Sequence, residues 1–260
     1  MHTADRIDHG AAVAAEAARF AALLADADLK VPVPTCPGWT LADLVRHAGG
    51  VHRWFSVLLR QRIQQPPAGR EVDLRLPERE DGYAEWLRAG AAEAAEVFAD
   101  TDPDAPMWVW GADGHARFWI RRMLFETLVH RVDAERALGL PSVIDPALAR
   151  DGVDEFLVNL PFAVLFAPKV AHLRGSGEAV RFRCTDGAGG SWLVRLRPDG
   201  FGLDADLGAD GRAVPADAEV RAGAADLLLL LYGRLDRTAP GVETTGDGSL
   251  LDLWFANSAF

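Results

Sequence analysis

Apolar residues recur at helical spacing in four segments of the first half of the chain. These segments cover residues 7–27, 41–58, 83–98 and 117–135, and the last of them contains neither glycine nor proline. A stripe of apolar positions every three to four residues is typical of a helix that buries one face. Four such helices, joined by connections of mixed length, predict a helical bundle.

The start of the second helix has a clear local signal. Three prolines between Val31 and Gly38 exclude a helix interior there, and Thr40 followed by Asp43 forms the pattern of a capping box. The Gly49–Gly50 pair within this helix costs about 1 kcal/mol per residue relative to alanine. We therefore expect a neighbouring helix to approach closely at the glycines, or the helix to bend.

The second half of the chain has a different pattern. A helix over residues 147–166, interrupted or kinked at Pro161, precedes two alternating segments, 179–185 and 191–197, which a glycine-rich turn separates as in a hairpin. Further elements are predicted as strands over 202–207 and 218–222 and as helices over 224–232 and 249–257. The expected fold class is α+β, with a four-helix bundle over residues 1–145 and a small α+β domain over residues 146–260.

Composition narrows the functional classes. The chain has 260 residues and a formal net charge of −11, which argues against a protein that binds the phosphate backbone of nucleic acids. Two distant cysteines, Cys36 and Cys184, do not make a disulfide framework. The first residues lack the layout of a signal peptide, and the longest apolar run, Leu227–Leu231, is too short to span a membrane. We expect a cytoplasmic protein that contacts neither nucleic acid nor membrane.

The fourth helix carries the residues that are most suited to binding a metal. On a helical projection Arg121, Arg131 and Glu135 form one charged side, whereas Glu126 and His130 lie on the opposite side, toward the interior. A buried carboxylate is unfavourable unless a partner compensates for its lost hydration. A metal ion is one such partner, because Glu and His one turn apart can reach the same cation.

A third candidate ligand comes from the second helix. His47 lies within the apolar stripe and is expected to point inward with Glu126 and His130, whereas His52 is predicted to lie on the flank, away from that face. Two imidazoles and one carboxylate are the ligand set of many catalytic zinc sites. The alternative is a buried ion pair between Glu126 and an arginine, for which Arg46, Arg53 and Arg122 are candidates. The residues alone leave both interpretations open.

Two motifs resemble signatures of a known family. Val33–His47 (VPTCPGWTLADLVRH) and Phe125–Ala134 (FETLVHRVDA) are similar to the two N-terminal signatures of the mycothiol-dependent maleylpyruvate isomerase family. Leu231–Arg234, Gly246–Asp247 and Trp254 are similar to its second domain. The resemblance implies a DinB-like four-helix bundle followed by a sterol-carrier-like α+β domain. It also implies zinc, or another divalent metal, bound by His47, Glu126 and His130, and mycothiol as a cofactor.

The expected function follows from this resemblance. A metal with an open position could bind and activate the thiol for attack on an electrophilic small molecule, as in an isomerase or an S-transferase. Arg234 is the resemblance-based candidate for binding substrate carboxylates, with Arg117 and Arg122 as runners-up. The alternative for Arg234 is an arginine that interacts with the last carbonyls of a helix. The expected partners are a small-molecule substrate and a low-molecular-weight thiol, and the expected state is a monomer or homodimer.

Further residues and functions have competing interpretations. Asp133 could orient a metal ligand, but an ordinary salt bridge with Arg136 or Arg122 is slightly favoured. Cys36 could be a fourth ligand or a reactive thiol, although a small buried thiol is the commoner case. The 100–114 loop, with two tryptophans, would shape specificity. The alternative functions are a metal-dependent hydrolase or transferase that uses metal-bound water, and a non-enzymatic regulatory module with a structural metal.

Overall fold

The structure is a computed structural model that describes residues 7–67, 72–187, 189–208 and 211–259. The chain divides into two compact units. The first unit runs up to Val109 and resumes over Asp113–Val143, and the second comprises Trp110–Ala112 and the chain from Ile144 onward. Residues 68–71, and Ala188 in the expected hairpin turn, lie outside the described residues.

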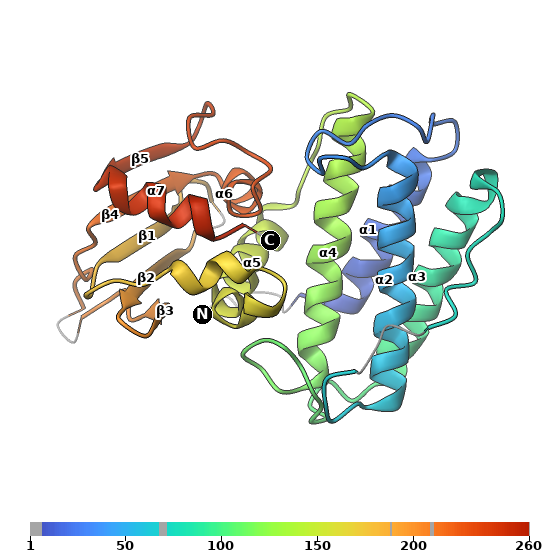
Figure 1. The fold of residues 1–260 in the computed structure, drawn as a ribbon, viewed down its shortest axis with the longest axis horizontal. Coiled ribbons are helices and arrows are strands. Elements are labelled where there is room, and N and C mark those ends of the chain that lie inside the picture. Colours follow the sequence, from blue (N-terminus) through green and yellow to red (C-terminus); the bar gives the residue numbers. More distant parts are fainter. Residues whose placement is uncertain (1–6, 68–71, 188, 209–210, 260) are drawn as a thin grey trace. The chain divides into compact units, whose positions relative to one another are not determined.

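The first unit is a bundle of the four predicted helices (Figure 1). The helices are α1 (His9–Leu23), α2 (Leu41–Gln61), α3 (Tyr83–Asp100) and α4 (Ala116–Ala137), and a short 3₁₀ turn, Glu80–Gly82, precedes α3. α4 packs against both α1 and α2, and α3 packs against the same two helices. The apolar stripes of the sequence meet in this core, where Phe20, Leu41, Leu44, Leu87 and Ala134 are fully buried.

The local signals at α2 are confirmed. Thr40 accepts a hydrogen bond from the backbone of Asp43, and the Asp43 carboxylate accepts one from the backbone of Thr40, which completes the capping box. Gly49 marks a close approach to α3, because a Cβ added there would lie 2.2 Å from the ring of Trp86. Gly49 therefore makes room for the Trp86 indole.

This close approach predicts that Gly49→Ala is destabilising. A methyl group at position 49 has to displace Trp86, and such overpacking lowers the free energy of unfolding by about 1–3 kcal/mol. Gly50→Ala is a matched control, since its Cβ would meet only Leu74 at 3.5 Å and alanine favours the helix by up to about 1 kcal/mol. Urea denaturation of the two variants measures the difference. Equal stability of both would show that Gly49 has no packing role.

α4 is more deeply buried than its pattern indicated. Arg131 is completely buried and Glu135 nearly so, which contradicts the expectation that the charged side of this helix lies opposite to the interior. The Arg131 guanidinium donates to Glu16 of α1 at 2.7 Å, to Glu135 at 2.6 Å and to the Val143 carbonyl at 3.2 Å. α1 covers this side of α4, and the charges are buried as a network rather than solvated.

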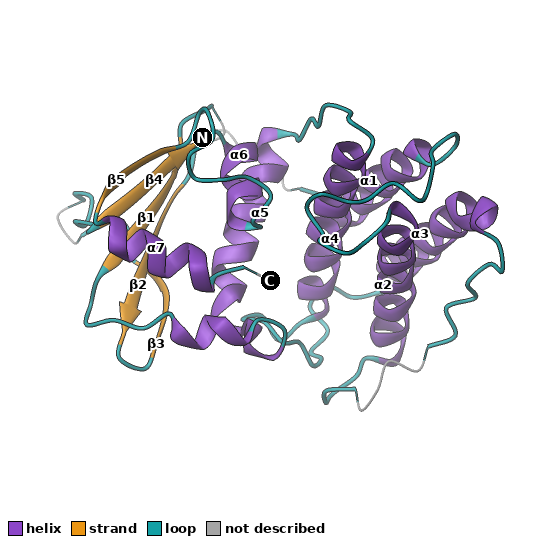
Figure 2. Ribbon diagram, turned by 45° about the horizontal axis from the view of Figure 1, so that its top comes forward, coloured by secondary structure: helices purple, strands orange, loops and turns teal. Residues whose placement is uncertain are grey.

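The second unit combines helices with one five-stranded sheet (Figure 2). It begins with α5 (Pro146–Asn159) and 3₁₀ turns over Leu160–Leu165 and Pro168–His172. The other elements are β1 (Ala179–Cys184), β2 (Ser191–Arg197), β3 (Gly200–Asp204), β4 (Ala218–Ala222), α6 (Ala224–Leu231), β5 (Glu243–Gly246) and α7 (Gly248–Asn257). The strand order is β3-β2-β1-β4-β5, with β1 and β4 parallel and the other pairs antiparallel.

Alternation along the strands separates two faces of this sheet. Phe182 of β1 and Phe201 of β3 lie against Trp254, which brings α7 onto the apolar face. The opposite face carries arginines that pair with acidic residues, as Arg195 does with Asp204 and Arg181 with Asp206.

The expected fold class is confirmed: a helical bundle is followed by a small mixed α+β unit. The hairpin, the fourth strand and the end of the 147–166 helix near Pro161 are also confirmed, since α5 gives way there to a 3₁₀ turn. The third strand was predicted over 202–207, but β3 covers Gly200–Asp204, so its bounds were wrong. β5 was not predicted. Within the described residues, no helix combines the length and apolar character needed to cross a membrane.

Candidate metal centre

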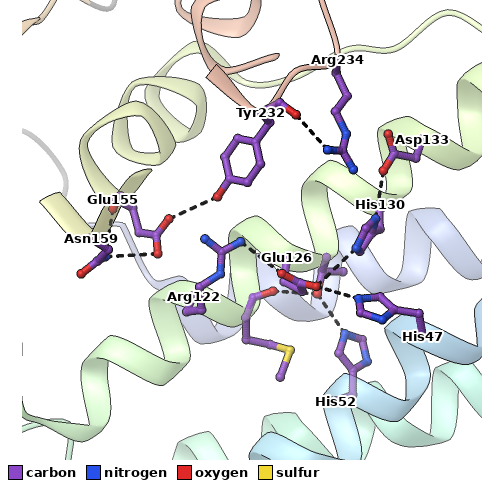
Figure 3. A network of polar contacts seen from close by, with 12 residues as sticks. His47, His52, Arg122, Glu126, His130, Asp133, Glu155, Asn159, Tyr232 and Arg234 are labelled. Atoms are coloured by element: carbon purple, nitrogen blue, oxygen red, sulfur yellow. Dashed lines mark hydrogen bonds and ion pairs between the residues drawn. The ribbon is translucent and has the colours of Figure 1, made fainter. Parts of the chain in front are cut away.

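α2 and α4 bring His47, Glu126 and His130 together in the bundle (Figure 3). Glu126 Oε1 lies 2.9 Å from His47 Nε2 and 3.3 Å from His130 Nε2. One donor atom from each residue falls within 4.8 Å of the others. The side chains of His47 and Glu126 are 31% and 23% exposed and are partly accessible, whereas His130 is nearly buried, with 11% of its side chain exposed.

The charges at this site are strongly coupled. Burial alone would raise the pKa of the Glu126 carboxyl, but hydrogen bonds with His130 and His47 and the charges of His130 and Arg122 hold that pKa well below its usual value. Burial would likewise lower the pKa of His130, but its hydrogen bonds with Asp133, Cys36 and Glu126 raise it well above the usual value. Glu126 therefore favours its ionised form, and His130 favours its protonated, positively charged form.

Asp133 fixes the orientation of the His130 ring. Its Oδ2 lies 2.9 Å from His130 Nδ1, and the carboxylate is fully buried (Figure 3). An ionised carboxylate only accepts, so Nδ1 carries a proton and donates. Asp133 therefore lies where it could orient His130, and the slightly favoured salt bridge with Arg136 or Arg122 stays a prediction.

The alternative partner of Glu126 is present as well. Arg122 Nη2 lies 3.2 Å from Glu126 Oε2, one turn before it on α4. The two carboxylate oxygens are divided between different groups, because Oε2 faces the guanidinium whereas Oε1 faces both imidazoles. An ion pair and a metal ligand are therefore compatible roles for the same side chain.

His52 was placed wrongly on the helical projection. It is 1% exposed rather than on an outer flank, and its Nε2 lies 2.9 Å from Thr127 Oγ1. The Thr127 hydroxyl donates to the Met123 carbonyl, so His52 donates to the hydroxyl oxygen from Nε2. Burial, assisted by the charge of Arg53, lowers the pKa of His52 to about 4. His52 is a neutral core residue that joins α2 to α4.

The donor chemistry of the trio fits a divalent metal. Two imidazole nitrogens and one carboxylate oxygen suit zinc, and the Nδ1 hydrogen bond to Asp133 is the arrangement in which a carboxylate orients a metal-ligating histidine. A second set of three donors, Cys36, His130 and Asp133, also has one atom per residue within 4.8 Å. Only the first set presents the two imidazoles and the carboxylate that the sequence singled out.

The other candidate residues have defined local positions. The Arg234 guanidinium donates to the Tyr232 carbonyl at 2.8 Å, at the end of α6. This contact is the one expected of an arginine that interacts with the last carbonyls of a helix. Arg117 pairs with Asp104 and Asp113 in an exposed cluster of the bundle. Trp119 donates to the Trp108 carbonyl at 2.9 Å, so this part of the 100–114 loop supports the bundle core.

Sequence reasoning missed the contact of Thr35 with Asp133 and the ring contacts of Trp39 with His47 and His130. Thr35 Oγ1 donates to Asp133 Oδ1 at 2.6 Å, across 98 positions of sequence. The Trp39 ring centroid lies 5.1 Å from that of His47 and 6.4 Å from that of His130. The available signal was their place in the proline-rich segment directly before α2, although no local pattern shows what that segment touches.

Fold and site together define a class of protein: a four-helix bundle with a His–Glu–His donor set on two of its helices, joined to a small mixed-sheet domain. Residues 11–135 match the model of the mycothiol maleylpyruvate isomerase N-terminal domain, and residues 147–253 match the model of the MDMPI C-terminal domain. The chain belongs to the mycothiol-dependent maleylpyruvate isomerase family.

Solved structures agree with this family at the level of the fold. A crystal structure of the mycothiol-dependent maleylpyruvate isomerase matches with a TM-score of 0.58 and 14% sequence identity, over 92% of this chain and 93% of that chain. A histidine-to-alanine mutant of that isomerase matches with a TM-score of 0.59, at the same identity and coverage. No curated protein matches this chain.

Proposed function

We propose that this protein is a metal-dependent enzyme that uses a low-molecular-weight thiol, in the manner of mycothiol-dependent maleylpyruvate isomerase, as an isomerase or S-transferase. The observation that carries the proposal is the position of Glu126 Oε1 between the Nε2 atoms of His47 and His130. Membership of the family supports the thiol, because both matched domain models belong to mycothiol-dependent maleylpyruvate isomerases.

Each residue of the trio has a role in this proposal. His47 and His130 would bind the metal through Nε2 and Glu126 through Oε1, while Arg122 keeps the second carboxylate oxygen in place. A bound divalent metal would supply the Lewis acidity that lowers the pKa of a thiol and makes it a nucleophile at neutral pH. Asp133 retains the Nδ1 proton of His130, so the ring presents Nε2 to the site.

Partial exposure of the trio favours a catalytic site over a structural one. A structural zinc is closed by four protein ligands, whereas a catalytic zinc has three and keeps one position open. His47 and Glu126 retain 31% and 23% exposure, which leaves a path for a small ligand. This supports an enzyme rather than a regulatory module, and the thiol distinguishes it from a hydrolase that uses metal-bound water.

The substrate proposed is a small electrophile with carboxylate groups, such as maleylpyruvate, and Arg234 is proposed to bind one of these groups. The ground for this role is the resemblance of Leu231–Arg234 to the second domain of the family. A charged hydrogen bond contributes about 1.5–3 kcal/mol, so Arg234→Met is expected to lower kcat/KM at least about tenfold. Arg237→Met is the control, since Arg237 pairs with Asp252 on the same unit.

The test is cis–trans isomerisation of maleylpyruvate by the zinc-loaded protein with and without mycothiol. We expect turnover only when both the metal and the thiol are present. Metal-dependent formation of hydrolysis products in the absence of the thiol would favour the hydrolase alternative. Stoichiometric zinc without any thiol-dependent reaction, across a panel of small electrophiles, would favour a regulatory module.

A further inference from the structure

The proline-rich segment before α2 forms a closed loop, residues 31–40. Val33 donates to the Trp39 carbonyl at 2.9 Å, Trp39 donates to the Cys36 carbonyl at 3.0 Å, and Leu41 donates to the Val31 carbonyl at 2.9 Å. Gly38 has a φ of +85°, a conformation that side-chain-bearing residues rarely adopt. The backbone of this loop is thus fixed by its own hydrogen bonds and by the start of α2.

Two side chains of this loop reach a buried carboxylate on α4. Thr35 Oγ1 donates to Asp133 Oδ1 at 2.6 Å, and Cys36 Sγ donates to Asp133 Oδ2 at 3.5 Å. The same Oδ2 accepts from His130 Nδ1 at 2.9 Å. Since an ionised carboxylate only accepts, the hydroxyl, the thiol and the imidazole all turn their protons toward Asp133.

The loop also covers both imidazoles of the trio. The Trp39 ring is stacked on His130 with an interplanar angle of 29° and is tilted by 57° to His47. A neutral histidine has two tautomers and can rotate about its side-chain bonds, so a metal site gains affinity when neighbours fix one orientation. The hydrogen bond from Nδ1 to Asp133 selects one tautomer of His130, and packing against the Trp39 ring restricts rotation of the imidazole.

We propose that the 31–40 loop is a positioning element for the metal centre, and that Thr35 and Cys36 are its positioning residues. Through Asp133 they hold the His130 ring with Nδ1 turned away from the site and Nε2 turned toward Glu126 and His47. The inference deepens the proposed function, because it rests on the trio as the metal site. It assigns a role to side chains that do not themselves bind the metal.

The competing possibility is that the loop supplies ligands directly. Cys36, His130 and Asp133 form the second donor set, and a metal there would use the Nδ1 edge of the same ring. The two possibilities differ in whether sulfur is bound to the metal. They also differ in which nitrogen of His130 keeps its proton.

Zinc affinity, measured by competition with a chromophoric chelator, provides the first test. Thr35→Val removes the hydroxyl but keeps the shape, and we expect affinity to fall about 10–100-fold, as for loss of other groups that orient metal ligands. Thr35→Ser restores the hydroxyl and should return affinity to within about threefold of wild type. Equal affinity of Thr35→Val and wild type would overturn the proposal.

Cobalt spectra of wild type and Cys36→Ser separate the two donor sets. A positioning role predicts no thiolate-to-cobalt charge-transfer band in either protein. A band that is present in wild type and lost in Cys36→Ser would make Cys36 a ligand and overturn the proposal.

The metal-free protein gives a readout that does not depend on the proposed function. Imidazole ¹H–¹⁵N NMR should show a protected, downfield Nδ1 proton on His130 that exchanges faster with solvent in Thr35→Val and is protected again in Thr35→Ser. If wild type shows this proton but binds no zinc, the positioning role stands and the proposed function fails. If the protein binds zinc but the His130 proton does not depend on Thr35, the metal site of the proposed function stands and the positioning role fails.

Discussion

Replacing His130 with alanine is expected to abolish stoichiometric zinc binding. The variant removes the Nε2 atom that lies 3.3 Å from Glu126 Oε1, and it leaves Asp133 without the imidazole proton that it accepts. Loss of a group that merely orients a ligand weakens metal affinity about 10–100-fold, so loss of a ligand should cost more than about a hundredfold. His47→Ala should have the same result.

Metal content of protein purified without chelator measures this effect, with about one zinc per chain expected in wild type. His172→Ala is the matched control, because it removes an exposed imidazole from the second unit. Circular dichroism of each variant establishes that the bundle is folded. A full metal complement in folded His130→Ala would exclude the trio as the metal site and leave Glu126 as the partner of Arg122.

The second large effect is expected from Arg131→Met, which removes the cation of the buried network in the bundle. Glu16 and Glu135 would remain buried and would keep the partly exposed Arg19 as an ion-pair partner. Loss of one partner of a buried ion pair lowers the free energy of unfolding by about 3–5 kcal/mol, because an uncompensated charge stays in the interior. Hydrogen exchange of α1 and α4 peptides, together with urea denaturation, measures the loss within the bundle.

Two comparisons define the origin of this effect. Arg46→Met removes an exposed arginine that pairs with Asp43, and its effect should stay within about 0.5 kcal/mol. A triple variant with Arg131→Met, Glu16→Leu and Glu135→Leu should recover much of the loss, since apolar replacement of a whole buried network is often neutral or stabilising. A triple variant as unstable as Arg131→Met would indicate lost packing rather than unpaired charge.

Local sequence was sufficient to predict an element of secondary structure wherever residues close in the chain make the contacts that form it. The helical stripes predicted α1 to α4, and Thr40 with Asp43 predicted the start of α2. Alternation on both sides of a glycine-rich turn predicted the β1–β2 hairpin. In these cases the periodicity of one element and the turn chemistry at its ends already contain the information.

The edge strand β5 could not be predicted from the local sequence. All four residues of β5, Glu243–Gly246, are exposed, so the strand has no alternation of apolar and polar residues for a pattern to detect. It exists because β4 offers an edge, and Glu219 pairs there with Thr245. The register of β3 likewise depends on its partner, since Val194 of β2 lies opposite Leu203.

At the candidate metal centre, helical spacing alone placed Glu126 and His130 on one side of α4, because residues four apart share a helix face. Only the tertiary structure decided what surrounds them. His52 is buried although the projection of α2 put it on the flank, and Asp133 faces His130 and Thr35 rather than functioning only as a surface charge. The physical reason is that burial and hydrogen bonding depend on which distant segment covers a residue, and the spacing within one helix carries no record of that segment.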